Sequence, residues 1–277
     1  MTRSIRLIVN ADDYGRTVEV SIGIRQAHLN GIITSTTCMM NMPTIFEDIK
    51  LALEEAPDLG LGVHLVLTAG RPLSPPDDMG TLTDSQGGFL KPDELLSRLG
   101  QIDPTQAQAE WRAQIEAFIT ASGRQPTHLD SHHHSSYFSE PLMRAMLELA
   151  CDYDCAIRQP RAFRPDGLPD GLPEQVQEPI QEYGPRLIAE FESRCPDVFY
   201  ASFYDDLATR QELLRILDDL SMGTSEIMCH PGYASPELIA SSYYSNQREI
   251  ELQILTDPTV KEIVEQKGIE LITFAEF

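Results

Sequence analysis

The sequence has few of the features that stabilise secreted proteins or direct proteins to membranes. Its 277 residues include five cysteines, an odd number without a Cys-x-x-Cys pair, so neither a disulfide framework nor a zinc finger is expected. No apolar run is long enough to cross a membrane. The N-terminus lacks a charged segment followed by a long apolar one, so no signal peptide is expected. These absences favour a cytoplasmic protein.

Basic residues are also scarce. Lys and Arg number 21 against 43 Asp and Glu, which gives a net charge of -22. Nucleic acid and anionic membranes need a basic surface, so both are disfavoured as main partners. Apolar residues make up 42% of the chain, a globular proportion that argues against general disorder.

Several well-known motifs are absent. No Gly-x-Gly-x-x-Gly or Walker A pattern follows the first expected strand, so a nucleotide-binding fold has no support. The sequence has no Gly-x-Ser-x-Gly elbow, and no cysteine lies in a protease signature. Serine or cysteine nucleophile chemistry is therefore poorly supported.

Strand-like and helix-like runs alternate along the chain, which predicts an α/β fold with a mainly parallel sheet. Strands are expected at residues 5–9, 32–40, 59–67, 127–131, 156–158, 198–203, 226–229 and 269–274. Helices are expected at 18–29, 45–55, 92–99, 105–122, 139–150, 186–194, 209–220, 245–255 and 259–266. Residues 68–90 and 159–183 are rich in Pro and Gly and are expected to be loops. Seven or eight strands over this length favour a barrel, regular or distorted, in one domain spanning 1–277.

The residues that can carry chemistry follow or end the expected strands, where sites form in parallel α/β folds. They are Asp12 and Asp13, then His64, then the cluster of His128, Asp130, His132, His133 and His134, and finally His230. Taken alone, an Asp pair is more often a turn, and a single His more often a hydrogen-bonded core or loop residue. Alternate residues of a strand share a face, so three polar residues of the cluster would line one face. Three consecutive His residues have no turn-forming rationale.

One Asp and two His make a site that suits a divalent ion such as Zn²⁺, Fe²⁺, Mn²⁺ or Mg²⁺ and leaves positions open for water and substrate. A remaining carboxylate could act as general base and a remaining His as general acid. This set of groups indicates a metal-assisted hydrolase. The pattern alone leaves open which residue takes which role.

At these residues the sequence resembles the YdjC-like carbohydrate deacetylases, in particular their chitooligosaccharide deacetylase branch. The matching segments are residues 8–15, 31–37, 62–68, 126–134 and 228–231, followed by Tyr244, Arg248, Glu251, Leu252, Leu255 and Thr256. They occur in order over nearly the whole chain. As a set they are far more specific than any one of them.

The resemblance implies a TIM-barrel-like (β/α) fold, a homodimer, and hydrolysis of the N-acetyl group of an amino sugar or chitooligosaccharide with release of acetate. It implies a divalent metal, Mg²⁺ or Zn²⁺, held by Asp13, His64 and His132. It places Asp12 as the base and His230 as the acid. Weaker candidates for orienting these groups or contacting the substrate are Arg158, Asp130, His128 and His134.

The sequence departs from the family pattern in three places. Ser136 stands where relatives commonly have another His, and Tyr14 stands where Phe is usual, which is expected to add a hydroxyl near the site. Residues 159–183 have no clear match and are expected to shape the substrate cleft.

Two alternatives stay open: a metal-dependent hydrolase of another bond (a phosphoester, another amide or a glycosidic bond), and a non-catalytic sugar- or metal-binding regulator.

Overall fold

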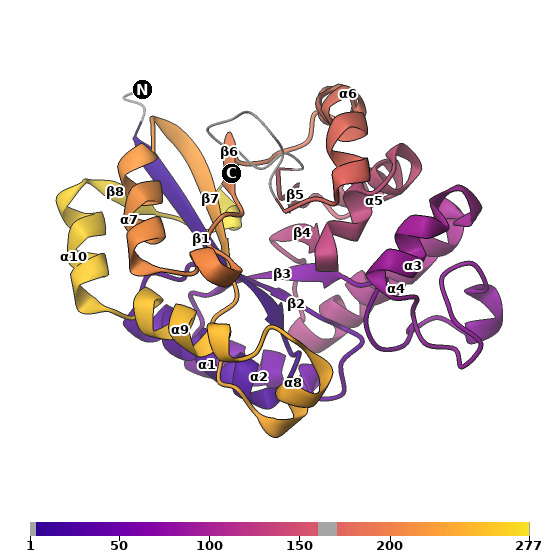
Figure 1. Cartoon of the computed structure of the whole chain (residues 1–277), viewed down its shortest axis with the longest axis horizontal. Coiled ribbons are helices and arrows are strands. Elements are labelled where there is room, and N and C mark those ends of the chain that lie inside the picture. Colours follow the sequence, from indigo (N-terminus) through magenta and orange to yellow (C-terminus); the bar gives the residue numbers. More distant parts are fainter. Residues whose placement is uncertain (1–3, 160–170, 277) are drawn as a thin grey trace.

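A curled, parallel β-sheet forms the centre of the molecule in the computed structural model, which describes residues 4–159 and 171–276 (Figure 1). Its strands are β1 (Ile5–Tyr14), β2 (Ser35–Cys38), β3 (Gly60–Leu65), β4 (His128–Ser131), β5 (Ala156–Ile157), β6 (Val198–Tyr200), β7 (Gly223–Cys229) and β8 (Ile269–Leu271). The hydrogen-bonded order is β5-β4-β3-β2-β1-β7-β6, and β8 pairs with β1. Every expected strand is confirmed, with shifted ends. The barrel-like (β/α) fold is confirmed in its distorted form, because β5 and β6 do not pair within the described residues.

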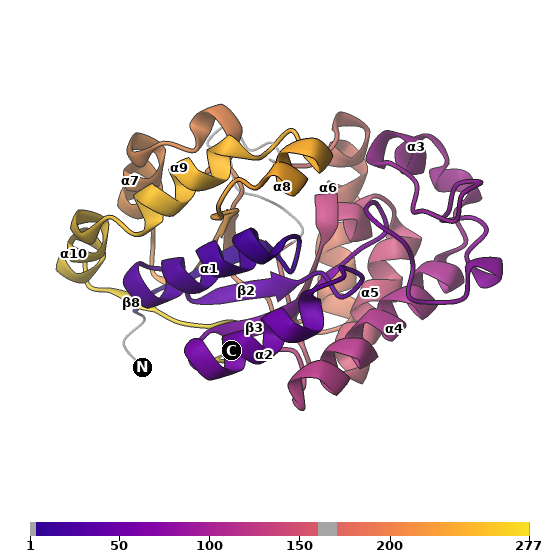
Figure 2. The same ribbon diagram turned by 90° about the horizontal axis from the view of Figure 1, so that it is seen from below.

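Helices surround the sheet on its outer side (Figures 1 and 2). They are α1 (Val18–Asn30), α2 (Ile45–Glu55), α3 (Pro92–Ser97), α4 (Pro104–Ser122), α5 (Glu140–Asp152), α6 (Glu174–Glu190), α7 (Arg210–Asp219), α8 (Pro236–Ser241), α9 (Asn246–Leu255) and α10 (Pro258–Gln266). Several begin at a side-chain cap that satisfies a free backbone N–H: Thr17 caps α1, Ser139 caps α5 and Thr209 caps α7. None of the described helices is both long and apolar enough to cross a membrane.

Strand β1 organises the sheet because it has neighbours along its whole length. It pairs with β7 from Ile5 to Ala11, while β8 covers the first part of its other edge and β2 the last part. Its alternate residues face opposite sides. Leu7, Val9 and Ala11 belong to the large apolar core that includes buried helix residues, whereas Ile8 belongs to a separate small cluster with Phe274. Further along the same face as Ile8 come Asn10 and Asp12, so the inner face changes from apolar to polar towards the end of the strand.

The expected loop at residues 159–183 is wrong in its second part, because α6 already begins at Glu174. Pro179 and Pro185 lie inside this helix, and proline normally disfavours a helix interior. The helix nevertheless forms because its buried residues, among them Val176, Ile180 and Leu187, recur at helical spacing on one face. Residues 160–170 of the expected loop lie outside the described residues. Helix α8 was not expected, whereas 68–90 contains no α-helix and has only a short 3-10 helix at Pro76–Asp78 and an isolated β-bridge.

Candidate metal centre and catalytic site

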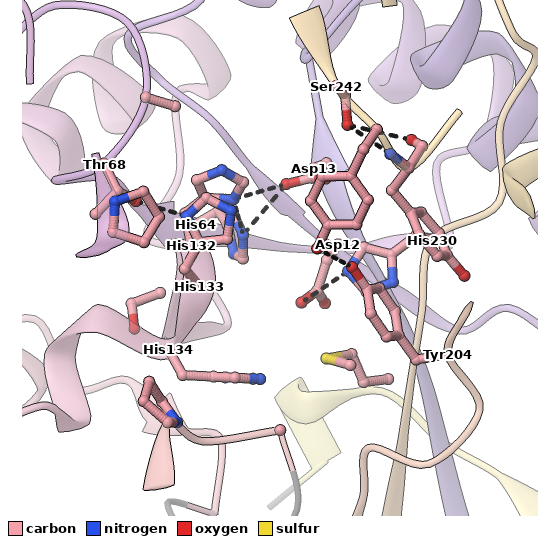
Figure 3. Close-up of a pocket in the computed structure, with 18 of the residues that line it drawn as sticks. Asp12, Asp13, His64, Thr68, His132, His133, His134, Tyr204, His230 and Ser242 are labelled. Carbon is pink, nitrogen blue, oxygen red and sulfur yellow. Dashed lines mark hydrogen bonds and ion pairs between the residues drawn. The ribbon is translucent and has the colours of Figure 1, made fainter. Parts of the chain in front are cut away.

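The carboxyl ends of β1, β3, β4 and β7 converge on one cavity of about 1210 Å³ (Figure 3). Asp12, Asp13, His64, His132 and His230 all line it. Apart from the adjacent Asp12 and Asp13, these residues are far apart in the sequence, and curling of the sheet is what brings their strand ends together. The structure therefore places the five residues expected to carry the chemistry in a single site.

A local irregularity lets two adjacent carboxylates reach the same cavity. The register between β1 and β2 shifts between Ala11 and Tyr14, which is the mark of a β-bulge. Within it Asp13 has a φ of 71°, in the left-handed region that residues other than glycine seldom adopt. A regular strand would point Asp12 and Asp13 to opposite faces. Strain of this kind is concentrated at functional sites, where the surrounding fold enforces it.

Asp13, His64 and His132 form a compact cluster of possible metal ligands. Asp13 Oδ1 lies 3.1 Å from His132 Nδ1 and 3.4 Å from His64 Nε2, and these two nitrogens lie 3.3 Å apart. Asp13 Oδ1 is buried and has no hydrogen-bond partner among the described residues. A buried oxygen without a partner, next to two imidazole nitrogens, fits a divalent cation, with nitrogen ligation suited to Zn²⁺ among others.

Each side of this cluster is held by a further charged residue. Asp130 Oδ1 accepts a hydrogen bond of 2.6 Å from His64 Nδ1, which leaves Nε2 to face Asp13. Arg248 Nη2 donates to Asp13 Oδ2 at 2.5 Å and leaves Oδ1 free. Burial raises the pKa of Asp13, but Arg248 and His132 outweigh it and hold that pKa well below its usual range. Asp13 is therefore ionised, as a metal ligand must be.

The two imidazoles of the cluster differ in charge. Burial lowers the pKa of His64, but the Asp130 and Asp13 carboxylates outweigh it and raise that pKa to about 10. Burial dominates at His132 and lowers its pKa. A cation bound here would displace the His64 proton, because a ligand imidazole is neutral.

Asp12 belongs to a different set of contacts. Arg158 Nη2 and Nη1 donate to its two oxygens at 2.6 and 2.7 Å, and Asn10 Nδ2 donates at 2.8 Å. Burial raises the pKa of Asp12, but Arg158 outweighs it, so that the net pKa is lowered. The carboxylate is thus ionised and fixed in orientation, as the bidentate pairing requires.

Arg158 also contacts two more carboxylates. Its Nη1 lies 3.0 Å from Asp130 Oδ2, and its Nε donates to Glu226 Oε1 at 2.8 Å. Burial raises the pKa of Glu226 to about 7, although Arg158 opposes the shift. Glu226 was missed in the sequence. The sequence feature that could have identified it is the alternation of side chains along β7, which puts Glu226 on the same side as Met228 and His230.

His230 faces Asp12 across the cavity, with Nε2 4.0 Å from Asp12 Oδ2 (Figure 3). Its backbone N–H donates to Glu251 of α9, which also accepts the Tyr244 hydroxyl. Burial lowers the pKa of His230 to about 4, so its imidazole is neutral at pH 7. Figure 2 shows α9 beside α1, and the two helices pack together. Helix α9 carries Glu251, which holds His230, and Arg248, which holds Asp13, so this packing helps to position both site residues.

The weaker candidates have different positions. His134 lines the cavity, as does His133, whose Nδ1 lies 2.9 Å from the Thr68 hydroxyl. His128 does not line the cavity: its ring stacks on Phe274 at 3.8 Å, and its Nε2 lies 3.1 Å from Asn10 Oδ1. Within residues 4–159 and 171–276, His128 is linked to the site through Asn10, which contacts Asp12.

The two substituted positions are both buried away from the cavity. The Ser136 hydroxyl pairs with that of Ser131 at 2.7 Å, so a short polar contact fills its position. The expectation of a Tyr14 hydroxyl near the site is wrong. That hydroxyl donates to Asp48 O at 2.6 Å and accepts from Arg25, because the ring points outward towards α2.

The family model described as YdjC-like protein matches residues 6–266. The chain belongs to this family. Among YdjC-like relatives, a carbohydrate deacetylase of Clostridium beijerinckii is 37% identical over 98% of this chain and 100% of its own length. A chitooligosaccharide deacetylase of Yersinia enterocolitica is 33% identical over 98% of both chains.

A solved structure shares the fold of this YdjC-like chain over its whole length. It is a protein from Enterococcus faecalis V583, assigned provisionally to cellobiose-phosphate cleavage. It has a TM-score of 0.86 and 32% identity, and the match covers 99% of this chain and 98% of that one. The expectation of a YdjC-like family member is confirmed.

Proposed function

We propose that this protein is a metal-dependent hydrolase that removes the N-acetyl group from an amino sugar or chitooligosaccharide and releases acetate. The observation that carries the proposal is the cluster of Asp13, His64 and His132, which shares one cavity with Asp12 and His230. A ligand cluster, a fixed carboxylate and a facing imidazole are the parts that metal-assisted amide hydrolysis needs. The names of the relatives support the substrate class.

Asp13, His64 and His132 would hold the cation, Zn²⁺ or Mg²⁺. When bound, a divalent ion polarises the acetamide carbonyl and lowers the pKa of a water molecule. Asp130 and Arg248 keep the ligand atoms pointed at that position. Their contacts maintain the geometry before the substrate arrives, which is what preorganisation requires.

Proton transfer uses Asp12 and His230. Asp12 is ionised, so its carboxylate can accept a proton from the attacking water. His230 Nε2, 4.0 Å from Asp12 Oδ2, is neutral and can take the proton and pass it to the leaving nitrogen. The C–O bond to the water oxygen forms and the C–N bond breaks. The products are the free amine and acetic acid, which ionises to acetate by releasing its proton to water, and neither residue changes its net charge over the cycle.

The proposal is tested by acetate release from N,N'-diacetylchitobiose. The protein is reconstituted with Zn²⁺ or Mg²⁺, and a portion treated with a chelator is the control. Release that depends on metal is expected. Metal bound at one equivalent with no acetate from any N-acetylated sugar would favour a non-catalytic binder. Hydrolysis of p-nitrophenyl phosphate alone would favour a phosphoesterase.

The proposal includes two features expected from the sequence, one domain over 1–277 and a cytoplasmic location, and one implied by the family resemblance, a homodimer. Limited proteolysis, cell fractionation and light scattering test them in turn. A mass of one chain by light scattering would contradict the homodimer and leave the proposed reaction unaffected.

A further inference from the structure

A row of tyrosines leads from His230 to an exposed ring in the lining of the cavity. The Tyr204 ring lies edge-on to His230 with centroids 5.3 Å apart (Figure 3). It also stacks on the Tyr244 ring, with centroids 4.3 Å apart. The Tyr204 hydroxyl is hydrogen-bonded to that of Tyr243 at 3.0 Å. The Tyr243 side chain is 78% exposed. The row thus joins a catalytic candidate to an aromatic ring that is open to solvent.

Two aliphatic side chains accompany Tyr243 on this wall. Leu207 is 53% exposed and Ile239 is 57% exposed, and both line the same cavity as Tyr243. They come from separate segments, Leu207 from the residues before α7 and Ile239 from α8. Exposed apolar area is unfavourable in water, and an apolar patch with a polar rim commonly marks a binding site.

We propose that Tyr243, together with the exposed Leu207 and Ile239 of the same cavity lining, is a platform for the sugar next to the one that is deacetylated. This inference rests on the proposed function and extends it, because it makes an oligosaccharide of two or more units the preferred substrate. The cavity of about 1210 Å³ exceeds the roughly 300–1,000 Å³ of ordinary small-ligand pockets, which leaves room for a second ring.

The chemistry of the wall suits a pyranose. Such a ring presents C–H groups on its faces and hydroxyls around its edge, so its face packs on an aromatic ring while its hydroxyls stay in water. The hydrogen bond to Tyr204 restrains the Tyr243 ring, so less conformational entropy is lost when a sugar binds. The stack of Tyr204 on Tyr244 supports that restraint from behind.

Binding is the direct test. With metal chelated, titration calorimetry compares N,N'-diacetylchitobiose with N-acetylglucosamine on the wild type, Tyr243→Ala, Tyr243→Phe and Met222→Ala. Met222 is 68% exposed and does not line the cavity, so it is the matched surface control. Tyr243→Ala is expected to weaken disaccharide binding about tenfold and leave monosaccharide binding unchanged. Tyr243→Phe, which keeps the ring, should stay within about threefold of wild type.

Three outcomes would overturn the platform. The first is that wild type and Tyr243→Ala bind the disaccharide with equal affinity. The second is that the wild type binds no chitooligosaccharide. The third is that Tyr243→Ala converts a dimer to a monomer, which would make this wall a contact between copies. Acetate assays on the same proteins separate the two proposals. If Tyr243→Ala leaves acetate release unchanged for chitooligosaccharides of every length, the platform is contradicted and the proposed reaction stands. If the disaccharide binds through Tyr243 but no acetate is released, the proposed reaction is contradicted and the platform stands.

Discussion

Arg158 holds the Asp12 carboxylate by two parallel hydrogen bonds of 2.6 and 2.7 Å. The same guanidinium contacts Asp130, the carboxylate behind His64, and is itself held by Glu226. One buried cation therefore aligns both the proposed base and the support of a proposed metal ligand. A planar fork is needed for this, and a lysine ammonium cannot replace it.

Arg158→Lys is expected to lower acetate release about 10–100-fold, the usual effect of losing a group that orients ligands. The charge is kept and only the fork geometry is lost. Arg98→Lys, at an exposed position with a 3.5 Å pair to Glu94, is the matched control and should behave as wild type. Wild-type turnover in Arg158→Lys would show that the bidentate contact is dispensable.

Asp12→Asn should keep the metal and lose turnover by about 10²–10⁴-fold, because an amide cannot accept the proton of the attacking water. Metal content by mass spectrometry and acetate release are measured on the same preparation. Asp58→Asn, an exposed position after α2, is the control. Full turnover in a metal-loaded Asp12→Asn protein would remove Asp12 from the role of base.

His132→Ala should lose both bound metal and activity, since one of three converging ligand atoms is removed. Metal stoichiometry after dialysis is the readout. His28→Ala on α1, outside the cavity lining, should retain the metal. If the metal content of His132→Ala equalled that of the wild type, the cation would have to sit elsewhere.

Glu226 predicts a pH dependence of stability. Burial raises its pKa from 4.5 to about 7. A carboxyl whose pKa is higher in the folded state binds its proton more tightly there, so its ionisation destabilises the fold as pH rises from 4.5 to 7. The cost at pH 8 is at most about 3 kcal/mol. Glu226→Gln cannot ionise, so its free energy of unfolding should fall less than that of the wild type between pH 5 and pH 8.

Urea unfolding at pH 5, 6, 7 and 8 measures this difference. Glu262→Gln, at an exposed position of α10, is the control and should follow the wild-type curve. Parallel curves for the wild type and Glu226→Gln would contradict the raised pKa.

Gly23 in α1 is expected to position His230 through a backbone contact. A Cβ added at Gly23 would lie 2.6 Å from the Cα of Gly232, two residues after His230. Gly23→Ala should therefore push this segment away, with a stability loss of about 1–3 kcal/mol and lower turnover. Gly100→Ala, with nothing within 4 Å of the added Cβ, should be neutral. Unchanged turnover in Gly23→Ala would show that the contact does not set the position of His230.

Much of the fold could be predicted from the sequence, because strand-like and helix-like runs alternate clearly. The gathering of Asp12, Asp13, His64, His132 and His230 followed from one physical rule, that parallel strands end on the same side of the sheet. Helix α6 could not be predicted in full, because Pro179 and Pro185 are local signals against a helix and tertiary packing overrides them.

The supporting residues were harder to predict than the residues they support. Glu226 lies in a buried strand, and its distant partner Arg158 explains the charge there. Arg248 and Glu251 matched the family without any sequence feature that gave them a role. Their contacts with Asp13 and His230 join positions more than 20 residues apart, which no local pattern encodes.

The sheet ends in two very short strands, β5 with two residues and β6 with three. An exposed sheet edge offers unpaired N–H and C=O groups, and long flat edges invite strand-to-strand growth between molecules. Strands this short offer too few groups to template such growth. Copies of this protein that associate are therefore expected to do so through helix or loop surfaces, and the short edges at β5 and β6 carry little risk of fibril-like assembly.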